Sequence, residues 1–433
     1  MSTSLFWHRR DLRINDNAGL YKALSHSENV IPIFIFDTTI LDRLPKNDQR
    51  VLFIHTYVEK LKQQYRSKGS DLQVLHGNPK ELIPEFCSAH NIHSVFTNRD
   101  YEPYAHERDQ FLYDALQSIG VSFHGAKDHV IFEKIEVTKD DGLPYTVFTP
   151  YSRKWKSKLN EYFLSSYPVE NYFGNLLKVE SISPIPSMQE LGFKADQIVP
   201  FPDEEVSDAL IKKYKEQRDL PAVSGTSRLS VHLRFGTISI RQLARQAMQQ
   251  SETFLNELIW RDFYQMILFH FPHSVNKSFK PQYDRIEWEH NEEHFKAWCE
   301  GRTGYPLVDA GMRELNATGF MHNRVRMVTA SFLTKHLLLD WRLGEAYFAE
   351  KLMDFELASN VGGWQWASGT GCDAAPYFRV FNPESQQQKF DPKFEYIKKW
   401  IPEFGTKDYP HPIVEHSFAR NRAIARYKEG LNT

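Results

Sequence analysis

Two pairs of side chains at helical spacing are the first candidates for chemistry. Asn323 and Met327 lie four residues apart, so they share one face of a helix. An amide beside a thioether is unusual in a simple core, and it suits a pocket that hydrogen-bonds the edge of a planar ligand and contacts its face. A capped helix start with a buried methionine is the structural alternative.

Glu257, Trp260, Arg261 and Tyr264 form a second candidate. Their spacing places them on one stripe of a helix whose other residues are mostly apolar. A polar and aromatic stripe within a wide apolar surface indicates a helix buried on most sides. The structural alternative is an Arg–Glu pair inside a helix bundle, with the tryptophan as packing.

The stretch 360–382, NVGGWQWASGTGCDAAPYFRVFN, is the third candidate. It contains Trp364, Trp366 and several glycines, and it is too aperiodic for a plain helix and does not alternate like a surface strand. Aromatic side chains on a glycine-rich backbone suit close approach to a flat ligand. A buried loop between helices, with both tryptophans in the core, would give the same composition.

Two weaker signals follow. Three hydroxyls and an arginine follow Gly225 at a loop-to-helix junction in GTSRLSVHL, where backbone amides and hydroxyls can bind phosphate, although capping explains the same serines. Tryptophan is readily oxidised by one electron, so a spaced row could carry a hole to the surface, with packing as the alternative for each. The tryptophans after residue 250 are Trp260, Trp288, Trp298, Trp341, Trp364 and Trp366.

Composition limits the possible classes of protein. The 433 residues exceed one ordinary core, and 41% hydrophobic and 25% charged residues are typical of a soluble globular protein. A net charge of -2 means that any nucleic-acid contact must use a local basic face. Three dispersed cysteines argue against a zinc site or a disulfide framework and predict a reducing compartment, no metal and no disulfide. The sequence shows neither a signal peptide nor an apolar run long enough to cross a membrane, so we expect a cytoplasmic protein of bacterial type.

The elements that must position these residues fall into two regions. Up to about residue 128, short apolar runs alternate with helical patterns, which predicts an α/β domain with a doubly wound parallel sheet. No GxGxxG follows the first strand; WHRRDLR stands there, and charge pairing of its arginines with Asp11 and Asp16 is the structural reading. Residues 129–202, rich in Pro and Ser towards their end, read as a connector, and 203–433 as an all-α domain.

Together these segments resemble the photolyase/cryptochrome family. The resemblance is carried by FWHRRDLRINDN, GTSRLSVHLRFGTIS, NELIWRDFY, WCEGRTGYPLVDAGMRELNATGFMHNRVRMVTASF and ASNVGGWQWASGTGCDAAPYFRVFNP, so it spans nearly the whole chain. It implies an N-terminal α/β antenna-type domain, a connector, and a helical domain that binds FAD and DNA. Within the family the chain most resembles class I cyclobutane pyrimidine dimer (CPD) photolyases, which repair these dimers with light and reduced FAD.

The resemblance implies roles for individual residues. Asn360 faces flavin N5, where a neutral amide suits a reduced, anionic flavin, and Asp354 pairs with Arg326 near the ring. The longer acid Glu356 stands where the family often has Asp. The implied FAD contacts are Tyr214, Thr226, Ser227, Arg228, Leu229, Ser230, Glu257, Arg261, Asn323, Arg326, Asp354, Glu356 and Asn360.

The resemblance also implies a lesion site. Glu257 hydrogen-bonds a thymine carbonyl of a flipped-out dimer, Trp260 and Trp366 form the pocket walls, and Asn323 and Met327 line its floor. Those two positions, which would carry a His pair in (6-4) photolyases, favour CPD repair. Further DNA contacts are Arg218, Arg261, Tyr264, Arg324, Arg379 and Lys389, and the electron-transfer triad is Trp288, Trp341 and Trp364.

The family leaves alternatives open. A cryptochrome photoreceptor is one, although the chain ends about 50 residues after FRVFNP, whereas signalling cryptochromes usually add a long tail. A DASH-type enzyme acting on single strands is another. The antenna chromophore is of deazaflavin, flavin or folate type, with FDTTILDRLPKNDQRVLF and NRDYEPYAHERD favouring the first two. We expect a monomer without an obligate protein partner, acting on damaged DNA.

Overall fold

The computed structural model describes residues 2–180, 182–196 and 199–432. The chain forms two compact units, each built from separate segments. The first comprises Met1–Glu133, Ser157–Glu205 and Arg228–Gln249, and the second Lys134–Lys156, Val206–Ser227 and Gln250–Thr433. The expected connector 129–202 is thus divided between the units, and the boundaries at 128 and 202 stay a prediction.

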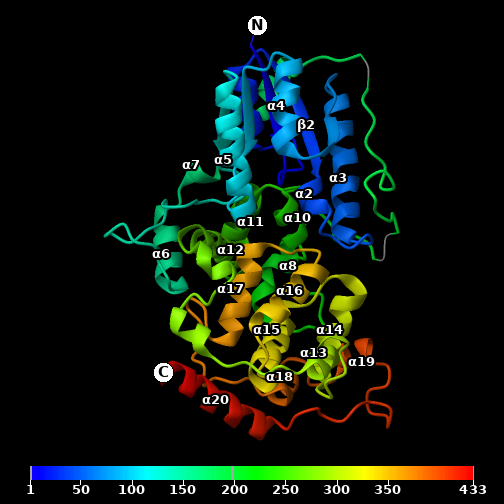
Figure 1. Ribbon diagram of the computed structural model, residues 1–433, viewed down its shortest axis with the longest axis vertical. Coiled ribbons are helices and arrows are strands. Elements are labelled where there is room, and N and C mark those ends of the chain that lie inside the picture. Colours follow the sequence, from blue (N-terminus) through cyan, green and yellow to red (C-terminus); the bar gives the residue numbers. More distant parts are fainter. Residues whose placement is uncertain (1, 181, 197–198, 433) are drawn as a thin grey trace. The chain divides into compact units, whose positions relative to one another are not determined.

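The first unit contains a five-stranded parallel sheet in the order β3-β2-β1-β4-β5 (Figure 1). β2 is a nearly continuous apolar run, as expected for a strand covered on both faces. The sheet confirms the predicted doubly wound α/β class. Its strands are β1 (Thr3–His8), β2 (Asn29–Asp37), β3 (Gln73–Gly77), β4 (Ser94–Asn98) and β5 (Ser122–Ala126).

Helices connect these strands, and several of them start at a residue whose side chain caps the helix. Asn17, Asp48 and Asn78 accept backbone N–H groups at the starts of α1, α3 and α4. The helices of the sheet region are α1 (Ala18–His26), α2 (Thr38–Leu41), α3 (Gln49–Arg66), α4 (Pro79–Ala89) and α5 (Pro103–Ser118). The later segments of this unit add α7 (Glu161–Leu164), a 3-10 turn Val169–Asn175, α10 (Ser230–Phe235) and most of α11 (Ile240–Gln250).

The second unit is helical in its described residues, as the sequence predicts. α12 (Glu252–His270) begins at the N-cap Ser251 and is buried along most of its surface. After α15 the chain widens into a π-helix over Phe332–His336. The helices are α6 (Phe148–Lys158, mostly in this unit), α8 (Asp208–Lys212), α9 (Tyr214–Gln217), α12, α13 (Glu292–Cys299), α14 (Pro306–Thr318), α15 (Asn323–Ser331), α16 (Trp341–Lys351), α17 (Leu357–Ser368), α18 (Pro383–Phe390), α19 (Glu395–Trp400) and α20 (His416–Asn432). Among the described residues, no helix is long and apolar enough to cross a membrane.

One expectation about this unit is wrong. The first part of the stretch 360–382 is helical, since α17 ends only at Ser368, where Gly369 adopts a left-handed conformation. The sequence pattern misleads because α17 is packed on several sides and so has no apolar stripe. A Cβ atom at Gly362 would lie 2.3 Å from the Tyr264 ring, so glycine is required there for close contact with α12.

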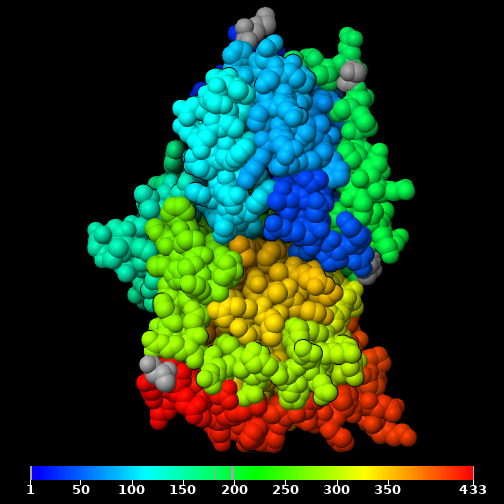
Figure 2. All heavy atoms as spheres, in the orientation of Figure 1, coloured from blue at the N-terminus to red at the C-terminus, as the bar shows by residue number. Residues whose placement is uncertain are grey.

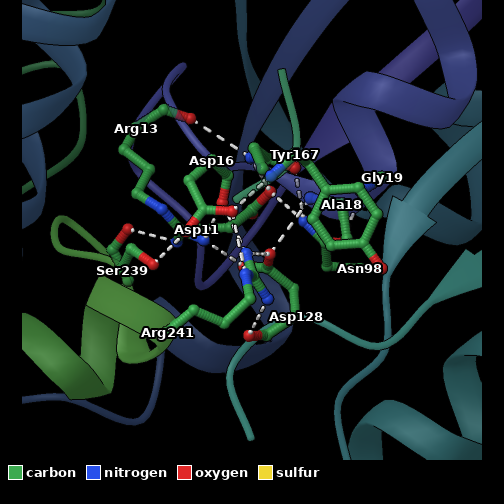
Figure 3. A network of polar contacts seen from close by, with 12 residues as sticks. Asp11, Arg13, Asp16, Ala18, Gly19, Asn98, Asp128, Tyr167, Ser239 and Arg241 are labelled. Atoms are coloured by element: carbon green, nitrogen blue, oxygen red, sulfur yellow. Dashed lines mark hydrogen bonds and ion pairs between the residues drawn. The ribbon is translucent and has the colours of Figure 1, made fainter. Parts of the chain in front are cut away.

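A network of buried polar residues joins two separate segments of the first unit (Figure 3). Arg241 of α11 donates to Asp16 at 2.8 Å and to Asp128 at 2.9 Å, and Arg13 donates to Asp128 at 2.7 Å. Burial alone would raise the pKa of Asp128, but Arg13 and Arg241 outweigh it and lower the pKa.

The expected pairing of the WHRRDLR arginines with Asp11 and Asp16 is wrong, because their partners come from later segments of the chain. Arg9 pairs with Asp109, Arg10 with Asp100 and Glu102, and Arg13 with Asp128. Asp16 pairs instead with Arg241.

Removing one member of this network should destabilise the protein strongly. Arg241→Gln leaves the buried Asp16 without a cation and Asp128 with only Arg13, so we expect the free energy of unfolding to fall by about 3–5 kcal/mol. Urea unfolding followed by circular dichroism measures this. Lys154→Gln, which removes an ion pair with the exposed Asp140, is the control and should change nothing measurable. Equal stability of the two variants would contradict a structural role for Arg241.

Candidate active site

The predicted stripe on α12 is present in the second unit. Glu257, Trp260 and Tyr264 are partly exposed, whereas the intervening Leu258, Ile259 and Phe263 are buried. Arg261 is 9% exposed and points its guanidinium at Glu356, with a donor–acceptor distance of 2.9 Å. The helix therefore presents one acid and two aromatic rings at a surface otherwise closed by apolar packing.

Glu257 is held by an arginine. Arg218 at the end of α9 donates to the Glu257 carboxylate, and its guanidinium lies 5.2 Å from the centre of the Tyr214 ring. Burial raises the pKa of Glu257, and the Arg218 charge opposes but does not cancel this effect. The neighbouring Asp219 pairs with Arg324 at 2.8 Å. A half-buried acid with a raised pKa and a fixed cation is an arrangement typical of functional sites.

His322 stands at the start of α15, beside the predicted floor residues. Its Nδ1 accepts the Arg324 backbone N–H at 3.1 Å, so the ring proton lies on Nε2. Nε2 is buried and has no protein partner. Burial lowers the pKa of His322 to about 4, so the ring is neutral near pH 7. On the same helix, Asn323 is exposed and Met327 is partly exposed.

Two further predicted contacts are paired with acids. The predicted Arg326–Asp354 pair is present, with distances of 2.9 and 3.1 Å. The Asn360 amide donates to the Glu345 carboxylate at 2.8 Å and to the Glu345 carbonyl at 3.1 Å. With both amide hydrogens on Glu345, the Asn360 carbonyl oxygen is the atom available to a ligand.

The three tryptophans of the predicted triad pack around one hydrophobic cluster. Trp341 and Trp364 are 1% and 2% exposed within it, and Trp288 is partly buried against it. A Cβ atom at Gly344 would lie 2.1 Å from the Trp364 ring, so glycine makes room for this indole. Packing thus accounts for their burial, and their role in electron transfer stays a prediction.

The other predicted residues lie elsewhere along the chain. The run Thr226–Ser230 leads into α10, whose first residue is Ser230. Arg228 adopts a left-handed conformation with φ 54°, which costs about 1–3 kcal/mol in a non-glycine residue. Tyr214 is buried, Trp366 is partly exposed near Phe381, and Arg379 and Lys389 are exposed. Nothing in their positions assigns them a ligand, so these roles stay predictions.

The donors near α12, α15 and α17 suit a planar, polar cofactor. Guanidinium groups of Arg261 and Arg326, the Asn360 carbonyl and the His322 N–H provide donors and an acceptor with fixed positions. A buried N–H without a partner costs about 1–3 kcal/mol, which a bound ligand can recover. Among the described residues, no group of His, Cys, Asp and Glu is arranged to hold a metal ion.

Comparison with known proteins indicates which cofactor these donors suit. The model for the FAD binding domain of DNA photolyase matches residues 254–407, and the DNA photolyase model matches residues 4–169. The chain is 39% identical to a deoxyribodipyrimidine photo-lyase of Halobacterium salinarum over 98% of both chains. It is 37% identical to that of Synechococcus sp., over 98% of this chain and 96% of the relative.

The chain belongs to the DNA photolyase family. An archaeal photolyase from Sulfolobus tokodaii, solved with two FAD molecules, aligns with a TM-score of 0.85 and 34% identity, over 99% of this chain and 100% of that one. The α/β and all-α architecture expected from the sequence is the architecture of the family. The cofactor prediction is also confirmed, because the matched model is an FAD-binding domain that covers α12 to α19.

Sequence reasoning missed partners that the structure supplies. Glu345, which orients Asn360, lies on a different helix, and Asp219 gave no signal beyond standing next to Arg218. Burial raises the pKa of Glu345, as it does for Glu257. Helical spacing links residues on one helix, so contacts between helices leave no such pattern in one sequence.

The neutral His322 predicts a pH-dependent stability. Because its folded pKa of about 4 lies below that of an unfolded histidine, the unfolded state binds more protons between about pH 4 and 6.5, and stability falls as the pH falls through this range. His322→Asn keeps a cap acceptor but cannot titrate. We expect the loss of unfolding free energy from pH 7 to pH 5 to be smaller in the variant by up to about 2 kcal/mol. Identical losses in urea unfolding would contradict a neutral, buried His322.

Proposed function

We propose that this protein is a deoxyribodipyrimidine photo-lyase that repairs cyclobutane pyrimidine dimers in DNA with blue light and reduced FAD. The observation that carries the proposal is the full-length match to relatives of that name at 37–39% identity. The partly exposed stripe of acid and aromatic residues on α12 supports it, because a pyrimidine dimer offers carbonyl acceptors and ring faces.

Glu257 is the proposed catalytic acid. Its raised pKa increases the fraction that carries a proton, and a protonated carboxyl can donate a hydrogen bond to a thymine carbonyl. That bond strengthens as negative charge develops on the dimer, so it favours the transition state more than the bound ground state. Arg218 fixes the carboxyl before the dimer arrives, so little reorganisation is needed.

Reduced FAD, when bound, supplies the light-excited electron that opens the two bonds between the pyrimidines and then returns, so no net oxidation occurs. Asn360 is proposed to face flavin N5 through its carbonyl, since Glu345 takes both amide hydrogens. Arg261 and Arg326 are proposed to hold the polar edge of the ring. Each guanidinium is already paired with an acid, Glu356 and Asp354, which fixes its orientation.

DNA is proposed to bind over this face without sequence readout. Arg379 and Lys389 are exposed, and Arg218 and Arg324 are partly exposed, so all four can reach phosphates. Trp260 and Trp366 are the proposed stacking walls for a flipped-out dimer, and Asn323 and Met327 its floor. We further propose that the protein acts as a cytoplasmic monomer and that its sheet unit holds an antenna chromophore of deazaflavin or flavin type.

The experiment that tests this function uses one duplex with a single thymine CPD. The protein with reduced FAD is held with the duplex in blue light or in darkness, and the remaining dimer is counted. Repair only in the light is the expected result. A flavin-loaded protein that repairs nothing would contradict the proposal and favour a cryptochrome, whereas repair restricted to single strands would favour a DASH-type enzyme.

Glu257→Ala should separate repair from binding. The lost hydrogen bond acts mainly on developing charge, so we expect repair per absorbed photon to fall about two- to tenfold while dimer affinity changes less. Glu252→Ala on the first turn of the same helix, where the acid pairs with Lys156, is the matched control and should repair normally. Equal losses of repair and affinity in Glu257→Ala would contradict a catalytic role for this acid.

A further inference from the structure

Trp260 already has an aromatic partner in the second unit. The rings of Phe148 and Trp260 are parallel to within 2°, with 3.7 Å between their centres. Most aromatic pairs prefer offset or edge-to-face arrangements with centres 4.5–7 Å apart. Phe263 meets both rings edge-on, at 6.0 and 5.6 Å. One face of the Trp260 indole is therefore covered at van der Waals contact.

Phe148 is fixed in this position by its backbone and its helix. Its N–H donates to the Asp373 carboxylate at 3.0 Å. The buried Trp155, two turns further along α6, donates its indole N–H to Asp262 of α12 at 3.0 Å. Such contacts at both ends of the segment hold Phe148 against α12.

Phe148 itself is partly exposed, and the residues before it lie at the surface. Leu143 and Val147, just before α6, are 57% and 43% exposed, and Figure 2 shows the teal residues of this part of the chain at the surface. Phe148 therefore does not stack on Trp260 merely because a closed core forces it there. The indole itself is partly exposed, and the Tyr264 ring lies beside it, tilted by 32° with 5.4 Å between the ring centres. Since Phe148 covers one face, a stacking ligand must use the other.

We propose that Phe148 is a positioning residue for the lesion site: it backs Trp260, fixes the plane of the indole, and leaves only the opposite face for a pyrimidine of the flipped-out dimer. This inference rests on the proposed function. A backed indole loses less freedom when the base stacks on it, so more of the stacking energy appears as affinity. Because undamaged duplex offers no flipped base, the effect should be confined to damaged DNA.

If Phe148 competes with the dimer, the predicted change in dimer affinity has the opposite sign. If Phe148 instead occupied the place of the pyrimidine, its ring would compete with the dimer. Removing the ring would then raise dimer affinity. The sign of the change in affinity therefore distinguishes a backing residue from a competitor.

The test measures dissociation constants in darkness for two duplexes that differ only in one thymine CPD. We expect Phe148→Ala to weaken binding of the damaged duplex about three- to tenfold, which corresponds to the loss of one aromatic pair. The dissociation constant for the undamaged duplex should not change. Phe148→Leu keeps apolar bulk without a flat ring and should behave in the same way. Phe148→Tyr keeps the ring and should bind like the wild type.

A double-mutant cycle with Trp260→Ala gives the decisive result. In that background Phe148→Ala should have no further effect, because there is no indole to position. Phe418→Ala, which removes an exposed ring from α20, is the matched control and should bind both duplexes normally. Tighter dimer binding, unchanged dimer binding, equal loss on both duplexes, or an undiminished effect without Trp260 would each overturn the inference.

A failure of the proposed function can be distinguished from a failure of the inference about Phe148. A wild-type protein that repairs no dimer in light would reject the photolyase proposal, whatever the Phe148 variants do. Normal wild-type repair with unchanged dimer affinity in Phe148→Ala would reject only the role of Phe148.

Discussion

The ion pairs of Arg241 are the constraint on which the sheet unit depends. Residues 228–249 join this unit only after the chain has contributed two segments to the helical unit. Apolar packing alone would fix such a late segment weakly, but the Arg241 guanidinium meets two buried carboxylates, Asp16 and Asp128, at hydrogen-bond distance. A misplaced segment would leave Asp16 buried without a cation and Asp128 with only Arg13, at a cost of several kcal/mol. The network therefore favours one position for α11 against the rest of the sheet unit.

In the helical unit, by contrast, α12 is held mainly by apolar packing. Most of this helix is buried by apolar neighbours, so its few polar side chains must be paired or face a ligand. Arg261 is satisfied by Glu356, whereas Glu257 keeps a raised pKa despite Arg218. An acid that stays partly destabilised in the free protein can gain from a new hydrogen bond. This follows from the same burial that makes α12 a rigid support.

The sequence allowed much of the fold to be predicted, for a physical reason. Strand–helix alternation and helical spacing are local properties, and all five strands lie before residue 128, where the alternating pattern predicted the sheet. α17 was mistaken for irregular structure because it is packed on several sides and so has no apolar stripe, and because it contains glycine where the Tyr264 ring leaves no room for a side chain. For the site, the motifs located α12, α15 and α17, but the partners Phe148, Glu345 and Asp219 come from other elements and follow no spacing rule.

These missed partners share one function, which is to fix side chains before a ligand arrives. Phe148 covers one face of Trp260, Glu345 takes the amide hydrogens of Asn360, and Asp219 pairs with Arg324. Each contact reduces the conformational entropy that a ligand would otherwise have to remove. The cost appears as local instability in the free protein, as at the buried Nε2 of His322, which has no hydrogen-bond partner. A site built in this way is stable only because the surrounding helices are packed tightly enough to support it.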